Sequence, residues 1–593
     1  MPTVKGNKKK FFSIIFVISV LVALTTAITL HFFGNAAFVK AFEKKPAQGL
    51  TISYPLNGTI FPPELVAPTF RWNDLRTFDN TWIIAVGFDG LKQKWRFRVH
   101  LQKWRPNRKV WEIFKKLSKD HTARITIVGF RQGVGNGLVM NNVCGDRTSF
   151  TTSKDPLNDP LFYRDVVLPF SEAVKDPSRL RWRFGAISDE HMPPVVLEKL
   201  PVCGNCHSFS ADGTTLAMDV DYANDKGAYA VTGVAREMKL TTSDIITWSD
   251  YKRDPDNPTF GLLSQISPDG RFVVSTVKDR SVFLAKPDLT FSQLFFPIQG
   301  ILAVFSRNSK RFASLPGADD TALVQSNPSW SPEGKYIVFA RSAVYHLKSL
   351  HDKTKALLTP EECSEFLTDQ KLFTYDLYRI PFNDGKGGRA EPLAGASGNG
   401  MSNFFARYSP DGKWIVFCQA KSFMLLQPDS KLYIMPANGG TPRLMQCNTN
   451  RMNSWHSWSS NSRWLVFASK GNTPYTQLFL THIDEQGNDA PAVVLDNLTS
   501  SDRAANIPEF VYNTPRSIER IAPQFIDDVS LWRAGMAFLD AHNADNAAMK
   551  FQEVVRLNPK NVRGLVSLGN IAESKGALDE ALNFYDRAIM ADS

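Results

Sequence analysis

The residues with the clearest capacity for chemistry form the pentapeptide Cys203-Gly-Asn-Cys206-His207. Two thiols separated by two residues can form thioether bonds to the two vinyl groups of one haem, and the adjacent imidazole can then ligate the iron. A Cys-x-x-Cys disulfide and half of a zinc site are the alternatives. A zinc site needs two further ligands, and the chain carries no second Cys-x-x-Cys pair. The pattern therefore favours one covalently attached haem c held by Cys203, Cys206 and His207.

A repeated turn begins directly after this motif and must position it. An aromatic or aliphatic residue is followed by Ser, Pro or Ala, Asp or Glu, and Gly, and then by a β-rich strand. Strong copies are centred on Ser210, Ser267, Ser331 and Ser409, and weaker copies on Ser306 and Ser459. Proline presets φ, the acidic side chain caps the turn and glycine takes the position with positive φ, so each copy predicts a β-hairpin.

These copies resemble the repeats of TolB-like β-propellers, and the resemblance covers roughly residues 200–510. Six copies imply a six-bladed TolB-like β-propeller, expected over residues 200–512, because radial repetition protects the edges of the sheets. The short gap between Ser306 and Ser331 predicts an abbreviated blade. The long gap between Ser331 and Ser409 predicts an insertion with helical character around Leu357–Leu372.

Alignment of the repeats also yields candidates for a second iron ligand. Only the first and last copies carry histidine three residues before the turn serine, at His207 and His456. The first and last blades of a closed propeller are expected to be neighbours, so His456 is a possible second axial ligand. The alternative for His456 is a hydrogen-bonded histidine of the propeller. Met218 is a less favoured ligand, because Leu216, Met218 and Val220 alternate on one strand face and predict core packing.

The N-terminus predicts a membrane location. Four lysines within residues 1–10 precede an uncharged apolar run over residues 11–33, which is long enough to cross a bilayer as a helix. Residues 1–10 are expected to form a cytoplasmic tail and residues 11–33 a transmembrane signal anchor. The chain is then a single-pass protein of the bacterial inner (cytoplasmic) membrane, with its bulk in the periplasm or outside. Cleavage near Ala36-Ala37 is the alternative.

Residues 50–180 read as short strands with β-branched and aromatic residues, separated by proline and glycine turns. This pattern predicts an immunoglobulin-like β-sandwich. Residues 92–124 contain twelve Lys and Arg against two acidic residues, close to the whole net charge of +11. Cations alternate with apolar residues here, as on a half-buried strand with a solvated cationic face. Contact with anionic lipid or an acidic partner is the sharper interpretation, and nucleic acid is not expected.

The C-terminus, residues 528–593, changes to helical periodicity with a repeat of 34 residues. The first copy places its signature residues at Leu531, Gly535, Phe538, Ala547, Phe551 and Pro559. The second copy places the equivalent residues at Leu565, Gly569, Ala572, Ala581, Tyr585 and Ser593. This pattern resembles two tetratricopeptide repeats, which implies α-helical pairs that pack on a partner or on the propeller. A helical cap that binds nothing is the alternative.

Composition and motifs narrow the function. The chain has 593 residues, 43% of them hydrophobic and 21% charged, which excludes a wholly disordered protein, and six cysteines exclude a disulfide scaffold. No Gly-x-Ser-x-Gly, His-Glu-x-x-His or Walker A motif is present, so no catalytic residue can be named and an enzymatic activity is not assigned.

The arrangement resembles bacterial exported proteins that join a sandwich, a TolB-like propeller with a Cys-x-x-Cys-His motif and tetratricopeptide repeats. The expected function is a membrane-anchored c-type haem protein for electron transfer or for redox or ligand sensing within a larger assembly. The alternative is a periplasmic scaffold, in which propeller and helical repeats bind protein partners without redox activity.

Overall fold

A computed structural model describes residues 49–76, 80–130, 144–200, 206–221, 225–252, 259–525, 527–540 and 542–592. The predicted tail and anchor, residues 1–33, lie outside these ranges. Among the described residues no helix is long and apolar enough to span a membrane. The prediction of a single-pass protein of the bacterial inner membrane is therefore corrected, since the structure gives a membrane anchor no support. The chain divides into two compact units, residues 1–154 and 155–593.

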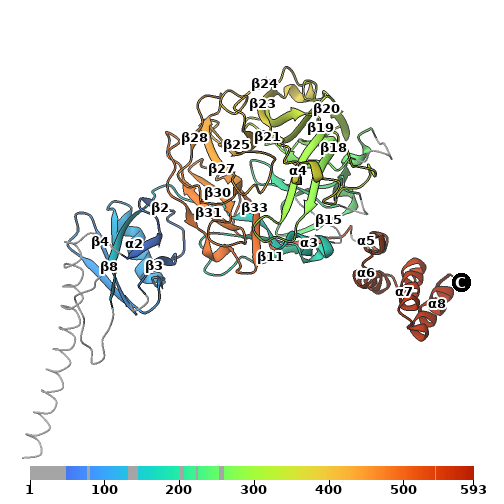
Figure 1. Cartoon of the computed structure of the whole chain (residues 1–593), viewed down its shortest axis with the longest axis horizontal. Helices are drawn as coiled ribbons and strands as arrows, with labels where there is room; N and C mark the ends of the chain where they lie inside the picture. Colours follow the sequence, from blue (N-terminus) through green and yellow to red (C-terminus); the bar gives the residue numbers. More distant parts are fainter. Residues whose placement is uncertain are drawn as a thin grey trace, which may run out of the picture. The chain divides into compact units, whose positions relative to one another are not determined.

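The N-terminal unit consists of two sheets and a helix (Figure 1). The three-stranded sheet contains β1 (Leu50–Tyr54), β3 (Phe70–Asp74) and β6 (Lys103–Trp104). The five-stranded sheet contains, in order, β2 (Thr59–Phe61), β8 (Cys144–Thr152), β7 (Ala123–Phe130), β4 (Thr81–Phe88) and β5 (Lys94–Val99). The last strand of this unit ends at Thr152, so the predicted sandwich boundary at residue 180 is wrong, because the strands that follow pair elsewhere.

Helix α2 (Arg108–Ser118) lies in the basic stretch and was not predicted. Its N-terminus is capped by Asn107, whose side-chain oxygen accepts a hydrogen bond from the Val110 amide at 2.9 Å. Trp111 and Phe114 on its buried face are fully enclosed, and the Trp111 indole donates to the Leu65 carbonyl at 2.8 Å. The apolar positions repeat at helical rather than strand spacing here, and the surrounding charge obscured that signal.

Strand β5 has the predicted alternation. Trp95 and Phe97 pack on Phe114, with ring centroids 5.6 and 6.3 Å apart. Arg96 and Arg98 alternate with them and point to the other side of the strand. Strand β5 is the last strand of its sheet in the described part of the chain, and a row of cations on such an edge discourages pairing with other chains. A lipid or an acidic partner for this face stays a prediction.

The second unit is built from six antiparallel four-stranded blades (Figure 1). Blade 1 contains β12 (His207–Phe209), β13 (Thr215–Asp219), β14 (Ala228–Gly233) and β16 (Ile245–Thr247). Blade 2 contains β17 (Leu262–Ile266), β18 (Phe272–Ala285), β19 (Gln293–Ser306) and β20 (Arg311–Ser314). Blade 3 contains β21 (Leu323–Trp330), β22 (Tyr336–Ala343), β23 (Asp376–Pro381) and β24 (Glu391–Pro392).

Blade 4 contains β25 (Ser402–Tyr408), β26 (Trp414–Ala420), β27 (Lys431–Pro436) and β28 (Arg443–Leu444). Blade 5 contains β29 (Asn453–Trp458), β30 (Trp464–Ser469), β31 (Gln477–His482) and β32 (Val493–Val494). Blade 6 combines β33 (Arg503–Phe510) with β9 (Leu161–Val167), β10 (Arg181–Gly185) and β11 (Val195–Glu198). A further strand, β15 (Glu237–Leu240), pairs in parallel with β34 (Arg520–Pro523).

The first strand of each blade lies innermost, and these strands contact one another in the order β12, β17, β21, β25, β29 and β33. The ring closes because β33 pairs with β9 and the Phe209 amide of blade 1 donates to Glu509 of blade 6 at 3.0 Å. The result is a six-bladed β-propeller. Its first strand begins at Leu161, so the predicted start at residue 200 is also wrong: strands β9 to β11 precede the Cys-x-x-Cys-His motif and belong to blade 6.

The hairpin chemistry predicted from the repeats is confirmed. Ser267 donates to Asp269 at 2.6 Å and accepts from the Phe272 amide at 2.9 Å, and Ser409 makes the same pair of bonds with Asp411 and the Trp414 amide. The turn glycines at positions 213, 270, 334 and 412 all have positive φ, between 66° and 71°. Each turn therefore fixes where an innermost strand ends and the second strand begins.

Two repeat assignments differ from the prediction. The weak copy at Ser306 joins β19 to β20 and lies within blade 2, so it is not an abbreviated blade. The sixth blade instead begins with β33, which has no turn serine and pairs with β9. The insertion after Ser331 is mainly irregular and contains only the short helix α4 (Ser364–Leu367) in place of the predicted longer helical segment. Helix α3 (Phe170–Lys175) follows β9.

The C-terminal region contains helices α5 (Asp528–Asp540), α6 (Ala544–Leu557), α7 (Val562–Ser574) and α8 (Leu578–Asp592). Equivalent contacts recur 34 residues apart. A β-carbon at Gly535 would strike the Phe551 ring, and one at Gly569 would strike the Tyr585 ring. Glycine is required at both positions because the helices of each pair approach closely there. The predicted helical pairs are thus present.

Candidate functional site

The innermost strands share a β-bulge that shapes the propeller axis. In β17, β21, β25, β29 and β33 the pairing register shifts at one point. One residue with positive φ lies at each shift, and these residues are Leu263, Asn327, Phe405, Trp455 and Ile507. The first four lie four residues before their turn serine. In blade 1 that position is Cys206, so the thiol of the motif occupies a place in the repeat that faces the axis.

Cys206 lines a cavity of about 730 Å³ at the axis. Most of the lining is apolar, and Leu263, Trp455 and Ile507 contribute the bulge residues of three other blades. This space is named the Cys206 cavity. Arg164 and Lys226 are the cationic residues at its wall, and Asp219 and Asp221 the acidic ones. Cys203 lies outside the described residues, three positions before the described chain resumes at Cys206.

Backbone hydrogen bonds fix Cys206 against β13. Its amide donates to the Asp219 side chain at 3.0 Å, and the Asp219 amide donates to the Cys206 carbonyl at 2.9 Å. Burial raises the pKa of Asp219 to about 8, because a carboxylate is poorly solvated there. Asp219 is therefore largely protonated at neutral pH. The site thus holds a fixed thiol beside a neutral acid and an apolar space.

His207 points to the other side of its strand, as neighbouring residues in a strand do. Its side chain is 1% exposed and lies between blades 1 and 6, where the Phe162 ring meets it edge-on at 4.7 Å. Neither ring nitrogen has a well-directed hydrogen bond within the described part of the chain. Burial, with Arg164 nearby, lowers the pKa of His207 to about 3, so the imidazole is neutral. The Phe162 and Ile507 backbones approach the ring, and a neutral imidazole without a well-directed hydrogen bond is chemically competent to ligate a metal.

Met218 lies directly opposite His207 in the β12–β13 ladder and is 1% exposed in the same core. Directly paired residues project from the same face of a sheet with their side chains alongside each other. Two axial ligands of one haem must instead approach from opposite faces of the ring. The register therefore favours core packing for Met218, which was the preferred interpretation of its sequence pattern.

His456 has a different environment. Its Nε2 atom lies 2.9 Å from the Val416 carbonyl, to which it donates, and Nδ1 lies 3.9 Å from the Cys418 sulfur. His456 belongs to β29 of blade 5, and strand β33 of blade 6 lies between it and blade 1. The expectation that the first and last repeat copies form neighbouring blades is wrong for this reason. The structure does not bring His207 and His456 together.

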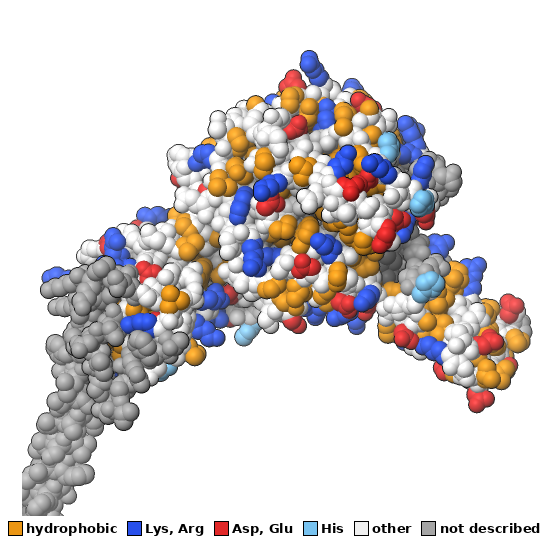
Figure 2. Space-filling view, viewed as in Figure 1, with side chains coloured by type: hydrophobic (Ala, Val, Ile, Leu, Met, Phe, Trp, Pro, Cys, Tyr) orange, Lys and Arg blue, Asp and Glu red, His pale blue; other side chains and the backbone are white. Residues whose placement is uncertain are grey.

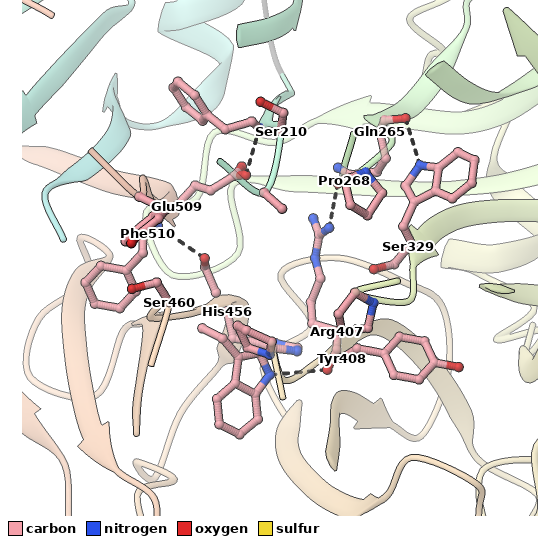
Figure 3. Close-up of a pocket in the computed structure, with 18 of the residues that line it drawn as sticks. Ser210, Gln265, Pro268, Ser329, Arg407, Tyr408, His456, Ser460, Glu509 and Phe510 are labelled. Atoms are coloured by element: carbon pink, nitrogen blue, oxygen red, sulfur yellow. Dashed lines mark hydrogen bonds between the residues drawn. The ribbon is translucent and has the colours of Figure 1, made fainter. Parts of the chain in front are cut away.

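A second cavity of about 670 Å³ lies on the turn side of the bulges, and His456 lines it (Figure 3). This space is named the Arg407 cavity. Trp455 and Ile507 line both cavities, so the two cavities adjoin at these bulge residues. Arg407 and Glu509 are its charged residues. Sequence reasoning missed both. Arg407 nevertheless stands out in the repeat alignment, because it lies two residues before its turn serine, where the copies at Ser267, Ser331 and Ser459 have glutamine or serine.

Comparisons with known proteins leave the family open. No family model matches the chain, and no curated protein matches it. Among solved structures it is similar to TolB from Acinetobacter baumannii, with 12% identity and a TM-score of 0.37, over 66% of this chain and 79% of that one. It is also similar to dipeptidyl peptidase 4 from Porphyromonas gingivalis, with 13% identity and a TM-score of 0.28, over 57% of this chain and 46% of that one.

Prolyl oligopeptidase B from Galerina marginata matches with 10% identity and a TM-score of 0.26, over 49% of this chain and 36% of that one. At TM-scores this low, the similarities carry no argument about activity. The mainly β, multi-sheet architecture of this chain follows from its own strand pairing.

Proposed function

We propose that this chain is a c-type haem protein whose haem occupies the Cys206 cavity. The observation that carries the proposal is the position of Cys206: the second thiol of a Cys-x-x-Cys-His motif opens into an apolar cavity at the propeller axis. The volume of about 730 Å³ is within the range of cofactor sites. A thiol at the wall of an apolar space is what thioether attachment of a porphyrin requires.

The residues of the site fit a haem in two respects: a thiol stands at the attachment point, and a neutral imidazole follows it in the sequence. Cys203 and Cys206 would hold the haem covalently, and the neutral imidazole of His207, which lacks a well-directed hydrogen bond among the described residues, suits an axial ligand. The orientation of His207 fits less well, because its ring lies between blades 1 and 6 while Cys206 faces the cavity. His456 is satisfied by Val416, and Met218 lies alongside His207. Neither therefore serves as a second ligand in this proposal.

The bound haem would supply one-electron exchange or ligand binding at its iron. The chain's own residues position and shield it. Leu263, Trp455 and Ile507 exclude water from one side, which raises the strength of electrostatic interactions within the cavity. Arg164 at the wall is a suitable neighbour for an anionic carboxylate of a cofactor. An electron-transfer or redox-sensing role follows from this arrangement.

Haem staining after denaturing electrophoresis tests the proposal. The full chain is expressed in a host with a working haem-attachment system, and its intact mass is measured. Haem that stays on the wild-type chain and is lost from Cys203→Ser and Cys206→Ser supports it. The matched control is Cys363→Ser, a buried thiol outside the cavity lining. A wild-type chain without added mass contradicts the proposal.

A protein-interaction role is a second candidate, and it has its own observation. Helices α5–α8 are proposed to form two tetratricopeptide repeats, and the last helix leaves apolar side chains on the surface (Figure 2). Leu578, Leu582 and Ile589 are each at least 60% exposed. In a helical repeat array this face is the one that packs against the next helix. A helical segment of a partner protein is the proposed occupant.

Site-specific crosslinking tests this second role. A photoreactive residue at Leu582 should give one discrete protein adduct in cells, whereas the same residue at Glu580 on the polar side should not. The adduct should disappear when Leu578 and Ile589 are both replaced by glutamate. A diffuse or absent product at Leu582 argues against an interaction through α8.

A further inference from the structure

The Arg407 cavity carries a charge pattern that the haem proposal does not use. Two residues before the turn serine, the innermost strands present Ser208, Gln265, Ser329, Arg407 and Ser457, and Glu509 holds the equivalent place in β33. All but Ser208 line the cavity. One cation and one anion therefore stand in an otherwise uncharged ring, on blades 4 and 6.

The two charges are held apart by separate partners. Arg407 donates to the Gln265 side chain of blade 2 at 2.6 Å, while Glu509 accepts from the Phe209 amide of blade 1 at 3.0 Å. Among the described residues neither Arg407 nor Glu509 forms an ion pair. Figure 3 shows both side chains entering the cavity from different strands. Each retains hydrogen-bonding capacity that faces the open space.

A wall of large apolar residues, aromatic except for one isoleucine, surrounds these charges. One residue before the turn serine, the strands present Phe209, Ile266, Trp330, Tyr408 and Trp458, and Phe510 is the equivalent residue of β33. The indole groups are fixed by the preceding blade: Trp330 donates to the Gln265 carbonyl at 3.2 Å, and Trp458 donates to the Arg407 carbonyl at 3.3 Å. Rigid aromatic faces next to charged groups favour ligands with one apolar part and one polar part.

We propose that the Arg407 cavity binds a small zwitterion of the amino-acid class with an apolar side group. The Arg407 guanidinium binds the ligand carboxylate, because its N–H groups can donate two parallel hydrogen bonds to the two carboxylate oxygens. The Glu509 carboxylate accepts hydrogen bonds from the ligand ammonium group. The side group lies against the aromatic wall. A volume of about 670 Å³ accommodates such a molecule, either free or as the end of a short peptide.

The proposal is independent of haem, because Arg407 and Glu509 line the Arg407 cavity and neither of them lines the Cys206 cavity. It also assigns opposite roles to two residues, which allows a chemical test with matched ligands. Removing the ligand carboxylate should have the same effect as removing Arg407, and removing the ligand ammonium the same effect as removing Glu509.

Calorimetric titration of the full chain tests this assignment. The probes are phenylalanine, its amide, its N-acetyl derivative and the dipeptide Phe-Phe. Phenylalanine or Phe-Phe should bind at least tenfold more tightly than the two blocked compounds. Arg407→Gln should remove the preference over the amide, and Glu509→Gln should remove the preference over the N-acetyl compound. Arg407→Lys, which keeps the charge without the fork, should give an intermediate affinity.

The control variant is Arg443→Gln, because Arg443 bonds to residues 486–488 outside the cavity and its loss should leave the affinity unchanged. Tighter binding of Phe-Phe than of phenylalanine identifies a peptide end as the ligand, and the reverse identifies a free amino acid. Absence of binding by both probes at millimolar concentration overturns the proposal. Equal binding of blocked and unblocked probes to the wild-type protein overturns it as well.

Discussion

Blades 1 and 5 carry histidine at the same position of the repeat, but the two side chains differ in their hydrogen bonds. His456 is 4% exposed and donates to the Val416 carbonyl, with the Cys418 thiol beside its other nitrogen. His207 is 1% exposed, and neither of its nitrogens has a well-directed partner among the described residues. Both pKa values are lowered to about 3 by burial. Equal burial therefore coexists with unequal hydrogen bonding.

This difference separates a structural histidine from a candidate ligand. A buried polar group without a partner costs stability, so its presence calls for a function. His456 connects β29 to β26 and needs no ligand. His207 lies next to the thiol of the Cys206 cavity and remains available. Sequence alignment alone treats the two residues as equivalent, whereas the hydrogen bonds distinguish them.

The largest expected effect concerns the thiols that neighbour the two histidines. Cys206→Ser should remove most of the covalently bound haem, because one thioether is lost. Cys418→Ser should retain it, since this thiol contacts only blade 5 groups and is fully buried. Haem per chain, measured by intact mass, checks both variants. Equal haem loss in the two variants would break the comparison.

The next effect is spectroscopic. His207→Ala should change the absorption spectrum and spin state of the oxidised haem protein, because it removes the candidate ligand. His456→Ala should leave both unchanged, since the Nε2 atom of His456 already bonds to Val416. A spectral change with His456→Ala would support His456 as the second iron ligand and would contradict the structural role given to it above.

Stability of the haem-free protein should also separate the two positions. His456→Leu leaves the Val416 carbonyl buried without its donor, so it should lower the free energy of unfolding by about 1–3 kcal/mol. His207→Leu removes only poorly directed contacts of the ring with the Phe162 and Ile507 backbones, so it should change the free energy of unfolding by less than about 1 kcal/mol. Urea unfolding of both variants against wild type measures the difference. Similar losses at both positions would show that His207 has a structural partner.

The smallest effect uses Asp279, a buried carboxylate that is satisfied at only one oxygen. Its Oδ1 accepts from the Phe260 and Gly261 amides at 3.1 and 3.2 Å, while Oδ2 has no partner among the described residues. Burial raises the pKa of Asp279 from 3.8 to about 7. The folded protein therefore keeps a proton that the unfolded chain releases, and this group lowers stability as the pH rises between these two values.

Asp279→Asn cannot titrate, so its free energy of unfolding relative to wild type should increase with pH. The increase should be about 1.4 kcal/mol per pH unit between pH 5 and 6 and should level off above pH 7. Urea unfolding at pH 5, 6, 7 and 8 measures it. A constant difference across this range would show that Asp279 is ionised in the folded protein.

The fold was predictable where local chemistry repeats. The serine, acidic residue and glycine of each turn determine a hairpin through short-range hydrogen bonds, so the turns at Ser267 and Ser409 could be read directly. The 34-residue spacing of Gly535 and Gly569 reported the close helix pairs in the same way. Strand β33 has no such turn, because the strand that follows it in space, β9, lies far away in the sequence. No local pattern records that pairing.

The type of the candidate site stays a prediction from the sequence, and its arrangement could not be predicted from the sequence. The spacing of Cys203, Cys206 and His207 indicated haem attachment without any structure. Where each side chain points depends on strand alternation and on the bulge, which the sequence does not mark. Arg407 of blade 4 and Glu509 of blade 6 line one cavity without forming an ion pair, and this cavity arises only when the ring closes.

Closure of the ring through β33 has a consequence for the order of events during synthesis. Synthesis proceeds from the N-terminus, so strands β9 to β11 and the Cys-x-x-Cys-His motif leave the ribosome about 300 residues before β33 does. Until β33 docks on β9, the seam between blades 5 and 1 stays open. The haem proposed for the Cys206 cavity would enter the axis through that seam and be attached there. Once the last strand is in place, entry of the haem would require the ring to reopen.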